Sequence, residues 1–357
     1  MPDIWFPYLG IEIEHLSKVA FRIGSLTIAW YGVIIAFGVV MGLLLARHLA
    51  KQSKQDPDLY TDFLIYALIF ALIGARIYYV AFEWDNYKDN LISVLDFRAG
   101  GLAIYGGVIG AYLTAAVFCK AKKYSLLELL DTSMPGLVLG QAIGRWGNFF
   151  NQEAFGSYTD NVFAMRLNVK TAAYTTAELL QNTVTKNGVR YIQVHPTFLY
   201  ESFGCLVILA ILLFVFKRRK FKGQVLFLYM IGYGLLRAYL ETLRTDQLLL
   251  WGTDFPVSVI TSLVFVLAGV ILTIVFARKE KLRLAVEASG ESYAPDIDTD
   301  PIDLDSSSEE EKSEDEDEEE EASEEASEEA SEDLKEETEE GSEEKQDKPL
   351  DEDDLWS

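Results

Sequence analysis

The chain has 357 residues, half of them hydrophobic, and yet its formal net charge is -24. This combination excludes a single globular domain of ordinary composition. The charge is unevenly distributed, because residues 284–357 contain 35 Asp and Glu against 4 Lys, a net charge of -31, which leaves +7 for residues 1–283. The sequence therefore predicts two parts: an apolar, slightly basic body, 1–283, and an acidic tail, 284–357.

Seven apolar stretches follow one another along the body. Each is close to the ~20 residues that an α-helix needs to cross ~30 Å of hydrocarbon. They are residues 26–49, 59–82, 102–119, 126–143, 197–216, 225–240 and 257–277. The fourth is the weakest, since Glu128, Asp131 and Pro135 interrupt it. A buried helix of a soluble protein resembles one such stretch, but seven predict an all-α polytopic membrane protein with about seven transmembrane helices.

The tail contains SEDEDEEEEASEEASEEASEDLKEETEE and almost no aromatic or branched aliphatic side chains. Such a segment cannot bury enough apolar surface to offset the entropy of ordering it. We therefore predict a disordered acidic tail.

The short loops after the first, third, fifth and seventh stretches are rich in Lys and Arg, and such loops face the cytoplasm in membrane proteins. We therefore expect the N-terminus outside and the C-terminus, with the tail, in the cytoplasm. With this orientation, polar residues of six stretches fall at one depth, in the outer leaflet. They are Tyr31, Arg76, Tyr105, Arg145, His195, Glu201, Arg237 and Glu241. Polar residues inside a membrane are costly and are candidates for function.

The segment GRWGNFFNQEAFG concentrates hydrogen-bonding side chains directly after the fourth stretch. Arg145 suits a phosphate, because its planar guanidinium donates two parallel hydrogen bonds and stays charged at any relevant pH. Asn148 and Asn151 add neutral donors, and Glu153 follows closely. A plain interfacial anchor explains Trp146 and the phenylalanines, but it does not need these polar partners. The segment therefore predicts a site for a lipid phosphate.

A second charged segment, YGLLRAYLETLRTD, ends the sixth stretch. Arg237, Glu241 and Arg244 are spaced by four and three residues, so they share one face of a helix. One carboxylate between two guanidiniums orients both and leaves a net positive charge for an anion. The alternative is a salt-bridge ladder, which gains only ~0.3–0.5 kcal/mol per pair on a surface. That gain does not account for three charges at the membrane edge.

Other polar residues carry less information. His195 is equally compatible with a ligand, a base and an interfacial side chain. Cys119 and Cys205 lie in or at the ends of apolar stretches without C-x-x-C spacing, which argues against a disulfide or a structural metal site. We expect no metal, no cofactor and no catalytic cysteine.

At this point the sequence resembles a known family. GRWGNFFNQEAFG is similar to the G-R-x-G-N-F-x-N-x-E-x-x-G signature of the bacterial prolipoprotein diacylglyceryl transferases. The segments WYG at residues 30–32, GARIYYV, GGLAIYGGVIG, HPTFLYES and YGLLRAYLETLRTD match as well, in order. The resemblance covers about residues 25–277 and leaves the tail outside.

The resemblance implies a seven-span enzyme of the bacterial plasma (inner) membrane, with its active site facing the outer leaflet. Such enzymes move the diacylglyceryl group of phosphatidylglycerol onto the thiol of the lipobox cysteine of a prolipoprotein. The reaction forms a thioether and releases glycerol phosphate, and it is the first step of lipoprotein maturation. The implied partners are phosphatidylglycerol, prolipoproteins and the lipid bilayer, with no nucleic acid.

The residues expected to act in catalysis are Arg145, Arg237, Tyr105, Glu153 and Glu241. Those expected to bind phosphatidylglycerol are Arg145, Tyr31, Asn148, Asn151, Gly156 and Arg244. Tyr105 stands where many family members have a histidine, so an imidazole base cannot be carried over and the identity of the base stays open. A phenol with a pKa near ~10 is a poor base at neutral pH. We expect Tyr105 to donate a hydrogen bond to phosphate or thiolate, with its ring against Gly106 and Gly107.

Three other classes of protein stay open as alternatives. A transporter or flippase for an anionic lipid also needs intramembrane arginines, but it more often has an inverted repeat and polar residues near the midplane. A lipid phosphatase or phosphotransferase needs an Asp cluster or a His nucleophile pair, which the outer layer lacks. A scaffold built on the tail leaves the outer layer unexplained.

Overall fold

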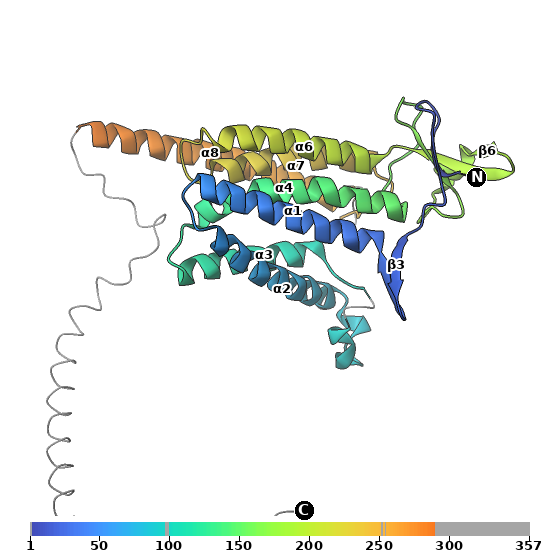
Figure 1. Ribbon diagram of the computed structural model, residues 1–357, viewed down its shortest axis with the longest axis horizontal. Coiled ribbons are helices and arrows are strands. Elements are labelled where there is room, and N and C mark those ends of the chain that lie inside the picture. Colours follow the sequence, from blue (N-terminus) through green and yellow to red (C-terminus); the bar gives the residue numbers. More distant parts are fainter. Residues whose placement is uncertain (1, 97–99, 251–252, 254, 290–357) are drawn as a thin grey trace, which may run out of the picture. The chain divides into compact units, whose positions relative to one another are not determined.

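The computed structural model of the chain describes residues 2–96, 100–250, 253 and 255–289. Seven long helices lie within these residues, one at each predicted stretch. They are α1 (Trp30–Gln52), α2 (Pro57–Phe82), α3 (Ile104–Ala121), α4 (Leu126–Asn151), α6 (Thr197–Phe216), α7 (Gln224–Leu243) and α8 (Val257–Ser289). They run side by side, with strands beyond one end of the helices (Figure 1). We call this the sheet end and the opposite one the loop end.

Five of the long helices, namely α1, α2, α3, α6 and α8, are long and apolar enough to cross a membrane by length and composition. Their apolar side chains are poorly covered by protein, since only 11% of the most apolar window of α8 and 17% of that of α2 is buried. Apolar surface left open on this scale needs hydrocarbon around it. The protein is therefore a mostly helical membrane protein. The helices α4 and α7 do not meet the same criterion, since Glu128 and Asp131 interrupt α4 and Arg237 and Glu241 interrupt α7.

The expectation of an all-α protein is wrong at the sheet end. Five antiparallel strands form a sheet in the order β2-β1-β5-β7-β6. Their bounds are β1 (Pro2–Phe6), β2 (Ile11–Glu14), β5 (Met165–Asn168), β6 (Val184–Lys186) and β7 (Val189–Val194). The sheet pairs the N-terminus with the long loop between α4 and α6, segments more than 150 residues apart. The short helices η1 (Trp84–Asn86), η2 (Leu91–Leu95) and α5 (Ala177–Gln181) complete the loops.

The first helix starts later than predicted, because a separate hairpin precedes it. Residues 26–29 form strand β4 (Leu26–Ala29), which pairs with β3 (Val19–Ile23), so α1 begins at Trp30 rather than at Leu26. Gly24 has a φ of 58°, a left-handed conformation that suits the tight turn between the strands. The hairpin places Tyr31 in the first turn of α1.

The fourth stretch is longer than predicted. Helix α4 continues beyond Ile143 to Asn151, so most of the GRWGNFFNQEAFG segment is helical. It ends where Gln152 adopts a left-handed conformation with a φ of 53°. Arg145, Asn148 and Asn151 therefore project from the last two turns of one helix.

Two apolar cores hold these elements. One lies among α1, α2, α3, α4, α6 and α7 and contains Leu49, Tyr60, Leu129, Leu212 and Val225. The other joins the sheet to the sheet-end turns of α4 and α6, because Ile4 and Leu167 pack in the same cluster as Phe149 and Phe198. Helices α2 and α3 also pack closely against each other. A Cβ on Gly106 of α3 would overlap the carbonyl oxygen of Gly74 of α2, so this contact depends on glycine.

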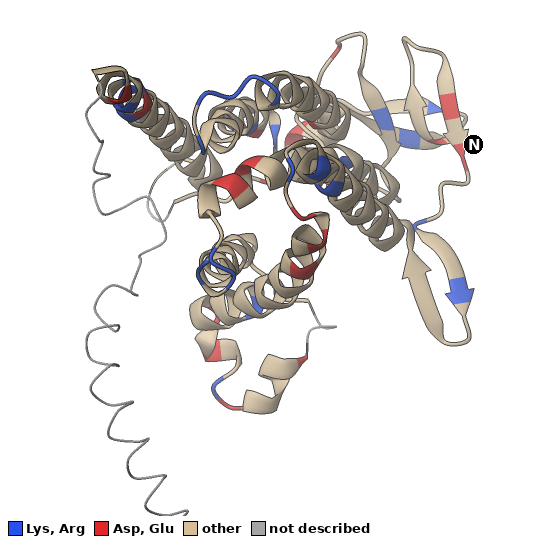
Figure 2. Cartoon of the chain, turned by 60° about the vertical axis from the view of Figure 1, so that its left-hand side comes forward, with Lys and Arg blue, Asp and Glu red and all other residues tan. Residues whose placement is uncertain are grey.

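Charge also differs between the two ends. Lys and Arg occur in the loops at the helix ends turned toward the viewer in Figure 2, which shows the loop end. They follow α1, α3 and α6 and lie in the last turns of α8. The last six described residues of α8 belong to the segment predicted as tail, and residues 290–357 lie outside the described residues.

Candidate functional site

The end of α4 brings together three of the predicted site residues. Chain reversal at Gln152 lets the Glu153 amide donate to the Asn148 carbonyl oxygen at 3.1 Å. Asn148 Nδ2 and Asn151 Nδ2 then both donate to Glu153 Oε1, at 3.1 and 3.0 Å. The two asparagines were expected to face a phosphate, and in this structure they hold the Glu153 carboxylate.

Arg145 has a partner that the sequence analysis did not assign to the site. Its Nη2 lies 2.7 Å from Oε1 of Glu201, in the second turn of α6, and the Glu201 side chain is only 3% exposed. A longer contact of 3.5 Å joins Arg145 Nη1 to Asn148 Oδ1. The Tyr233 hydroxyl of α7 donates to the same Glu201 oxygen at 3.1 Å. Helices α4, α6 and α7 thus meet at one buried carboxylate.

The charged residues of α7 are only partly arranged as predicted. Arg237 and Glu241 do form an ion pair, with Nη2 and Oε2 2.6 Å apart. Arg244, however, lies beyond the end of α7 in an extended conformation, and it forms a two-point contact with Asp246 at 2.8 and 2.6 Å. The prediction of one carboxylate shared by two guanidiniums is therefore wrong, because the helix ends at Leu243, before the third charge.

Backbone pairing explains where Arg244 lies. Gly156 and Arg244 form an antiparallel bridge, and the Ser157 amide donates to the Leu243 carbonyl oxygen at 2.7 Å. The Gly156 amide donates to the His195 carbonyl oxygen at 3.0 Å. A Cβ on Gly156 would lie 2.7 Å from the Leu243 oxygen, so only glycine fits here. Gly156 therefore joins three segments of the site by close packing.

Tyr233 stands where α4, α6 and α7 meet. It donates to Glu201, the partner of Arg145, and it lies one turn before Arg237 on α7. Its ring stacks on Tyr229 with centroids 5.5 Å apart, and Gln141 of α4 donates to the Tyr229 hydroxyl at 3.1 Å. We call Arg145, Glu201, Tyr233, Arg237 and Glu241 the arginine cluster.

The cluster is not an uncompensated positive site, which corrects the expected net positive charge. Arg145 and Arg237 each have one carboxylate partner. Pairing is what allows arginines to lie in a membrane at acceptable cost. A guanidinium has five N–H donors, however, and one carboxylate does not use them all. Arg237 Nη1 is buried without a hydrogen-bond partner among the residues that the structure describes. The cluster thus keeps donor capacity after its charges are paired.

Two predicted tyrosines lie at the edge of the site. The Tyr31 ring packs against Gly147 of α4, where a Cβ would lie 2.7 Å from the ring, and Tyr31 is 39% exposed. The Tyr105 hydroxyl, at the start of α3, is 3.5 Å from Thr261 Oγ1 of α8, and its ring lies 6.4 Å from that of Tyr78. Gly106 packs on Gly74 and Tyr78 of α2. Among the described residues, no hydrogen bond or ion pair joins Tyr105 to the cluster.

Two other residues of the predicted outer layer have local partners. His195 Nδ1 lies 3.4 Å from both the Tyr200 hydroxyl and Asn161 Nδ2, and burial lowers the pKa of the imidazole. Arg76 donates to four backbone carbonyl oxygens of the α2–α3 loop, those of Ser93, Val94, Gly100 and Gly101, at 2.7 to 2.9 Å. Arg76 therefore organises a loop.

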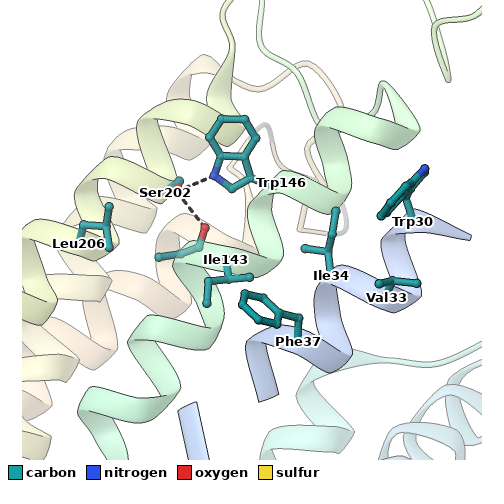
Figure 3. Close-up of a pocket in the computed structure, with 9 residues that line it drawn as sticks. Trp30, Val33, Ile34, Phe37, Ile143, Trp146, Ser202 and Leu206 are labelled. Atoms are coloured by element: carbon teal, nitrogen blue, oxygen red, sulfur yellow. Dashed lines mark hydrogen bonds between the residues drawn. The ribbon is translucent and has the colours of Figure 1, made fainter. Parts of the chain in front are cut away.

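An apolar groove of about 420 Å³ lies among α1, α4 and α6. Helix α4 forms its floor with Ile143 and Trp146, on the same turn as Arg145, while Phe37 of α1 and Leu206 of α6 form the sides (Figure 3). The Trp146 indole N–H donates to Ser202 Oγ at 3.3 Å, which fixes the ring at the α4–α6 contact. The groove is lined almost entirely by apolar side chains.

Tyr233 is the residue that sequence reasoning missed, and Glu201 was placed in the outer polar layer but was not assigned to catalysis or to lipid binding. A carboxylate in the otherwise apolar stretch 197–216 was the available signal for Glu201, whereas Tyr233 is marked only by its position one turn before Arg237. In the described part of the chain, no group of three His, Cys, Asp or Glu could hold a metal ion, and both cysteines are free and buried.

Fold and site together define a helical membrane protein with a buried arginine–carboxylate site at the sheet end of its helices. Residues 18–275 match the model of the prolipoprotein diacylglyceryl transferase family. The chain is 44% identical over 265 residues to the phosphatidylglycerol–prolipoprotein diacylglyceryl transferase of Finegoldia magna, covering 74% of this chain and 97% of the relative. Enzymes of the same name from Listeria welshimeri, 44% identical with 74% and 92% covered, and Clostridium botulinum, 40% identical with 74% and 99% covered, are similar. The chain belongs to the prolipoprotein diacylglyceryl transferase family.

Proposed function

We propose that this protein transfers the diacylglyceryl group of phosphatidylglycerol to the thiol of a cysteine in a prolipoprotein. The observation that carries the proposal is the donor capacity of the arginine cluster. Arg145 and Arg237 come from different helices, and each is paired with a carboxylate. Membership in the family and the names of the similar enzymes support the same activity.

The phosphodiester of phosphatidylglycerol accepts hydrogen bonds from the free N–H groups of Arg145 and Arg237. An acyl chain lies in the groove among α1, α4 and α6, with Trp146 and Phe37 against it. The cluster thus binds the phosphate of the lipid, and the groove binds its apolar part. Asn148, Asn151 and Glu153 form the rim of the same site at the end of α4.

The chemistry is a displacement at a glyceryl carbon. The cysteine thiol loses its proton, the thiolate sulfur forms a bond to the glyceryl carbon, and the bond from that carbon to the phosphate oxygen breaks. Glycerol phosphate leaves with the bonding electron pair. Negative charge grows on the phosphate during this step, and fixed guanidiniums stabilise it. The thiol comes from the substrate, since Cys119 and Cys205 are buried among apolar helices.

The proposed topology has seven spans, with the sheet end outside and the loop end in the cytoplasm. The basic residues near the loop-end termini of α1, α3, α6 and α8 support this orientation. Helices α4 and α7 complete the seven spans, since their arginines Arg145 and Arg237 are paired with carboxylates of the helices, Glu201 and Glu241. Cysteine placed at Ser25 should react with a membrane-impermeant maleimide added outside whole cells, and cysteine at Ser53 should not. The reverse pattern would overturn the orientation.

The direct experiment uses purified protein, phosphatidylglycerol and a peptide with a lipobox cysteine. Mass spectrometry should detect a diacylglyceryl thioether on the peptide and free glycerol phosphate. The peptide with serine in place of cysteine is the control and should stay unmodified. If no thioether forms while the protein moves labelled phosphatidylglycerol between the leaflets of vesicles, the protein is a lipid flippase and the proposal fails.

A further inference from the structure

A buried polar network joins the three helices that carry the arginine cluster. It runs from Gln141 on α4 to Tyr229 and Tyr233 on α7, then to Glu201 on α6 and back to Arg145 on α4. The Glu201 carboxylate is its centre, because both the Tyr233 hydroxyl and the Arg145 guanidinium meet at the same oxygen, Oε1. Networks of this kind in a low-dielectric interior fix side chains in one arrangement.

Burying the Glu201 carboxylate costs free energy unless hydrogen-bonding and cationic partners compensate for the lost water. Its side chain is 3% exposed, and its position within α6 surrounds it with apolar residues. The Arg145 side chain is 24% exposed, so the pair joins a buried anion to a partly accessible cation. Nη2 of the guanidinium lies 2.7 Å from Glu201 Oε1, and Nη1 lies 3.5 Å from Asn148 Oδ1, whereas a guanidinium carries five N–H donors. The pair therefore fixes one edge of the guanidinium and leaves the rest available.

We infer that Glu201 is a positioning residue for Arg145. Its carboxylate holds one edge of the guanidinium, with help from Tyr233, so that the free edge is presented to the phosphate of the lipid. Glu201 itself does not touch the substrate and acts through Arg145. The inference rests on the proposed function of the cluster as a phosphate site.

The matched control is Glu128, a second carboxylate on a long helix that pairs with cations from another segment. Glu128 of α4 lies 3.7 Å from Arg219 Nη2 and 3.5 Å from Lys222 Nζ, at the loop end and away from the cluster. Replacing either glutamate with glutamine removes one negative charge from an ion pair at nearly constant volume. Only the change at Glu201 should disturb the binding of a phospholipid at the sheet end.

The test measures phosphatidylglycerol binding by native mass spectrometry and thioether formation, for E201Q, E128Q and R145K and for the double variant R145K/E201Q. E201Q should lower both quantities, the transfer by roughly tenfold to a hundredfold, the range expected when a hydrogen bond to a charged group is lost. E128Q should leave both unchanged. In the R145K background, adding E201Q should cost little more, because the guanidinium that it orients is already absent.

Two results would overturn the inference. One is a folded E201Q protein with the binding and transfer of the unchanged chain. The other is a loss that multiplies fully with that of R145K, since a purely structural role for Glu201 predicts independent effects. If E201Q does not fold, E201D serves as the test variant. It keeps the negative charge, but its shorter side chain moves the carboxylate away from Arg145. Folded E201D with full activity would also overturn the inference. If the unchanged protein binds phosphatidylglycerol in a Glu201-dependent way but forms no thioether, then the proposed reaction fails and the positioning role stands.

Discussion

Arg76 and the pair Arg145 and Arg237 occupy equivalent places in the sequence, yet the structure uses them in opposite ways. All three arginines lie in long helices at the predicted outer depth. Arg76 donates to four carbonyl oxygens and is 2% exposed, so its donors are taken up by the loop around it. Arg145 and Arg237 each have one carboxylate partner, and Arg237 Nη1 has no hydrogen-bond partner. Unused donor capacity, rather than the presence of charge, distinguishes the proposed ligand site from the structural one.

The largest expected effect comes from replacing Arg145 or Arg237 with lysine. A lysine keeps the charge and can still pair with Glu201 or Glu241, but it loses the planar fork that meets both carboxylate and phosphate. Transfer should fall on the order of 100-fold, as when a preorganised donor to a developing anion is removed. Thermal stability in detergent should change little. Full transfer by either variant would show that the guanidinium geometry is unnecessary.

Arg76→Lys should give the reverse pattern. One ammonium cannot satisfy four carbonyl oxygens, so buried acceptors are left unpaired at a cost of ~1–3 kcal/mol each. We expect the midpoint of thermal unfolding to fall by roughly 5 °C, while transfer per folded molecule stays within a few-fold of the unchanged chain. An Arg76→Lys protein that loses transfer without losing stability would contradict the structural role of Arg76.

A moderate effect is expected at Tyr105. Its hydroxyl contacts Thr261 and not the arginine cluster, so Tyr105→Phe should lower turnover by roughly threefold to tenfold, the value of one hydrogen bond. Tyr105→His should remain active. Thr261→Val, which removes the partner and keeps the tyrosine, is the matched control. A Tyr105→Phe protein that binds phosphatidylglycerol but is wholly inactive, with activity in the unchanged chain rising only near pH ~10, would make the phenolate the base.

The smallest effect is expected from removing residues 290–357. The described contacts of the arginine cluster lie within the residues that remain, and truncation after Ser289 keeps the whole of α8. Transfer per correctly inserted molecule should equal that of the full chain when both are quantified by mass spectrometry. A large loss would give the acidic tail a direct part in catalysis.

Local sequence predicted the long helices and the main polar residues, since apolar stretches of spanning length and charged residues within them are visible without any knowledge of packing. Local sequence could not predict the sheet, in which β1 pairs with β5 across more than 150 residues. Local sequence also could not pair Arg145 with Glu201, because Glu201 lies 56 residues away on another helix. Arg244 was misplaced because its backbone pairs with Gly156, which ends the helix earlier than the side-chain spacing indicated.

The most direct measurement asks whether the unused donors of Arg145 and Arg237 contact the phosphate of phosphatidylglycerol. Solid-state NMR can detect dipolar coupling between the phosphorus of the lipid and ¹⁵N in the guanidinium groups of arginine-labelled protein in bilayers. We predict a coupling in the unchanged chain that is weakened by Arg145→Lys or Arg237→Lys, absent from the double variant and retained in Arg76→Lys. A coupling that survives in the double variant, or that only Arg76→Lys removes, would contradict the assignment of the arginine cluster as the phosphate site.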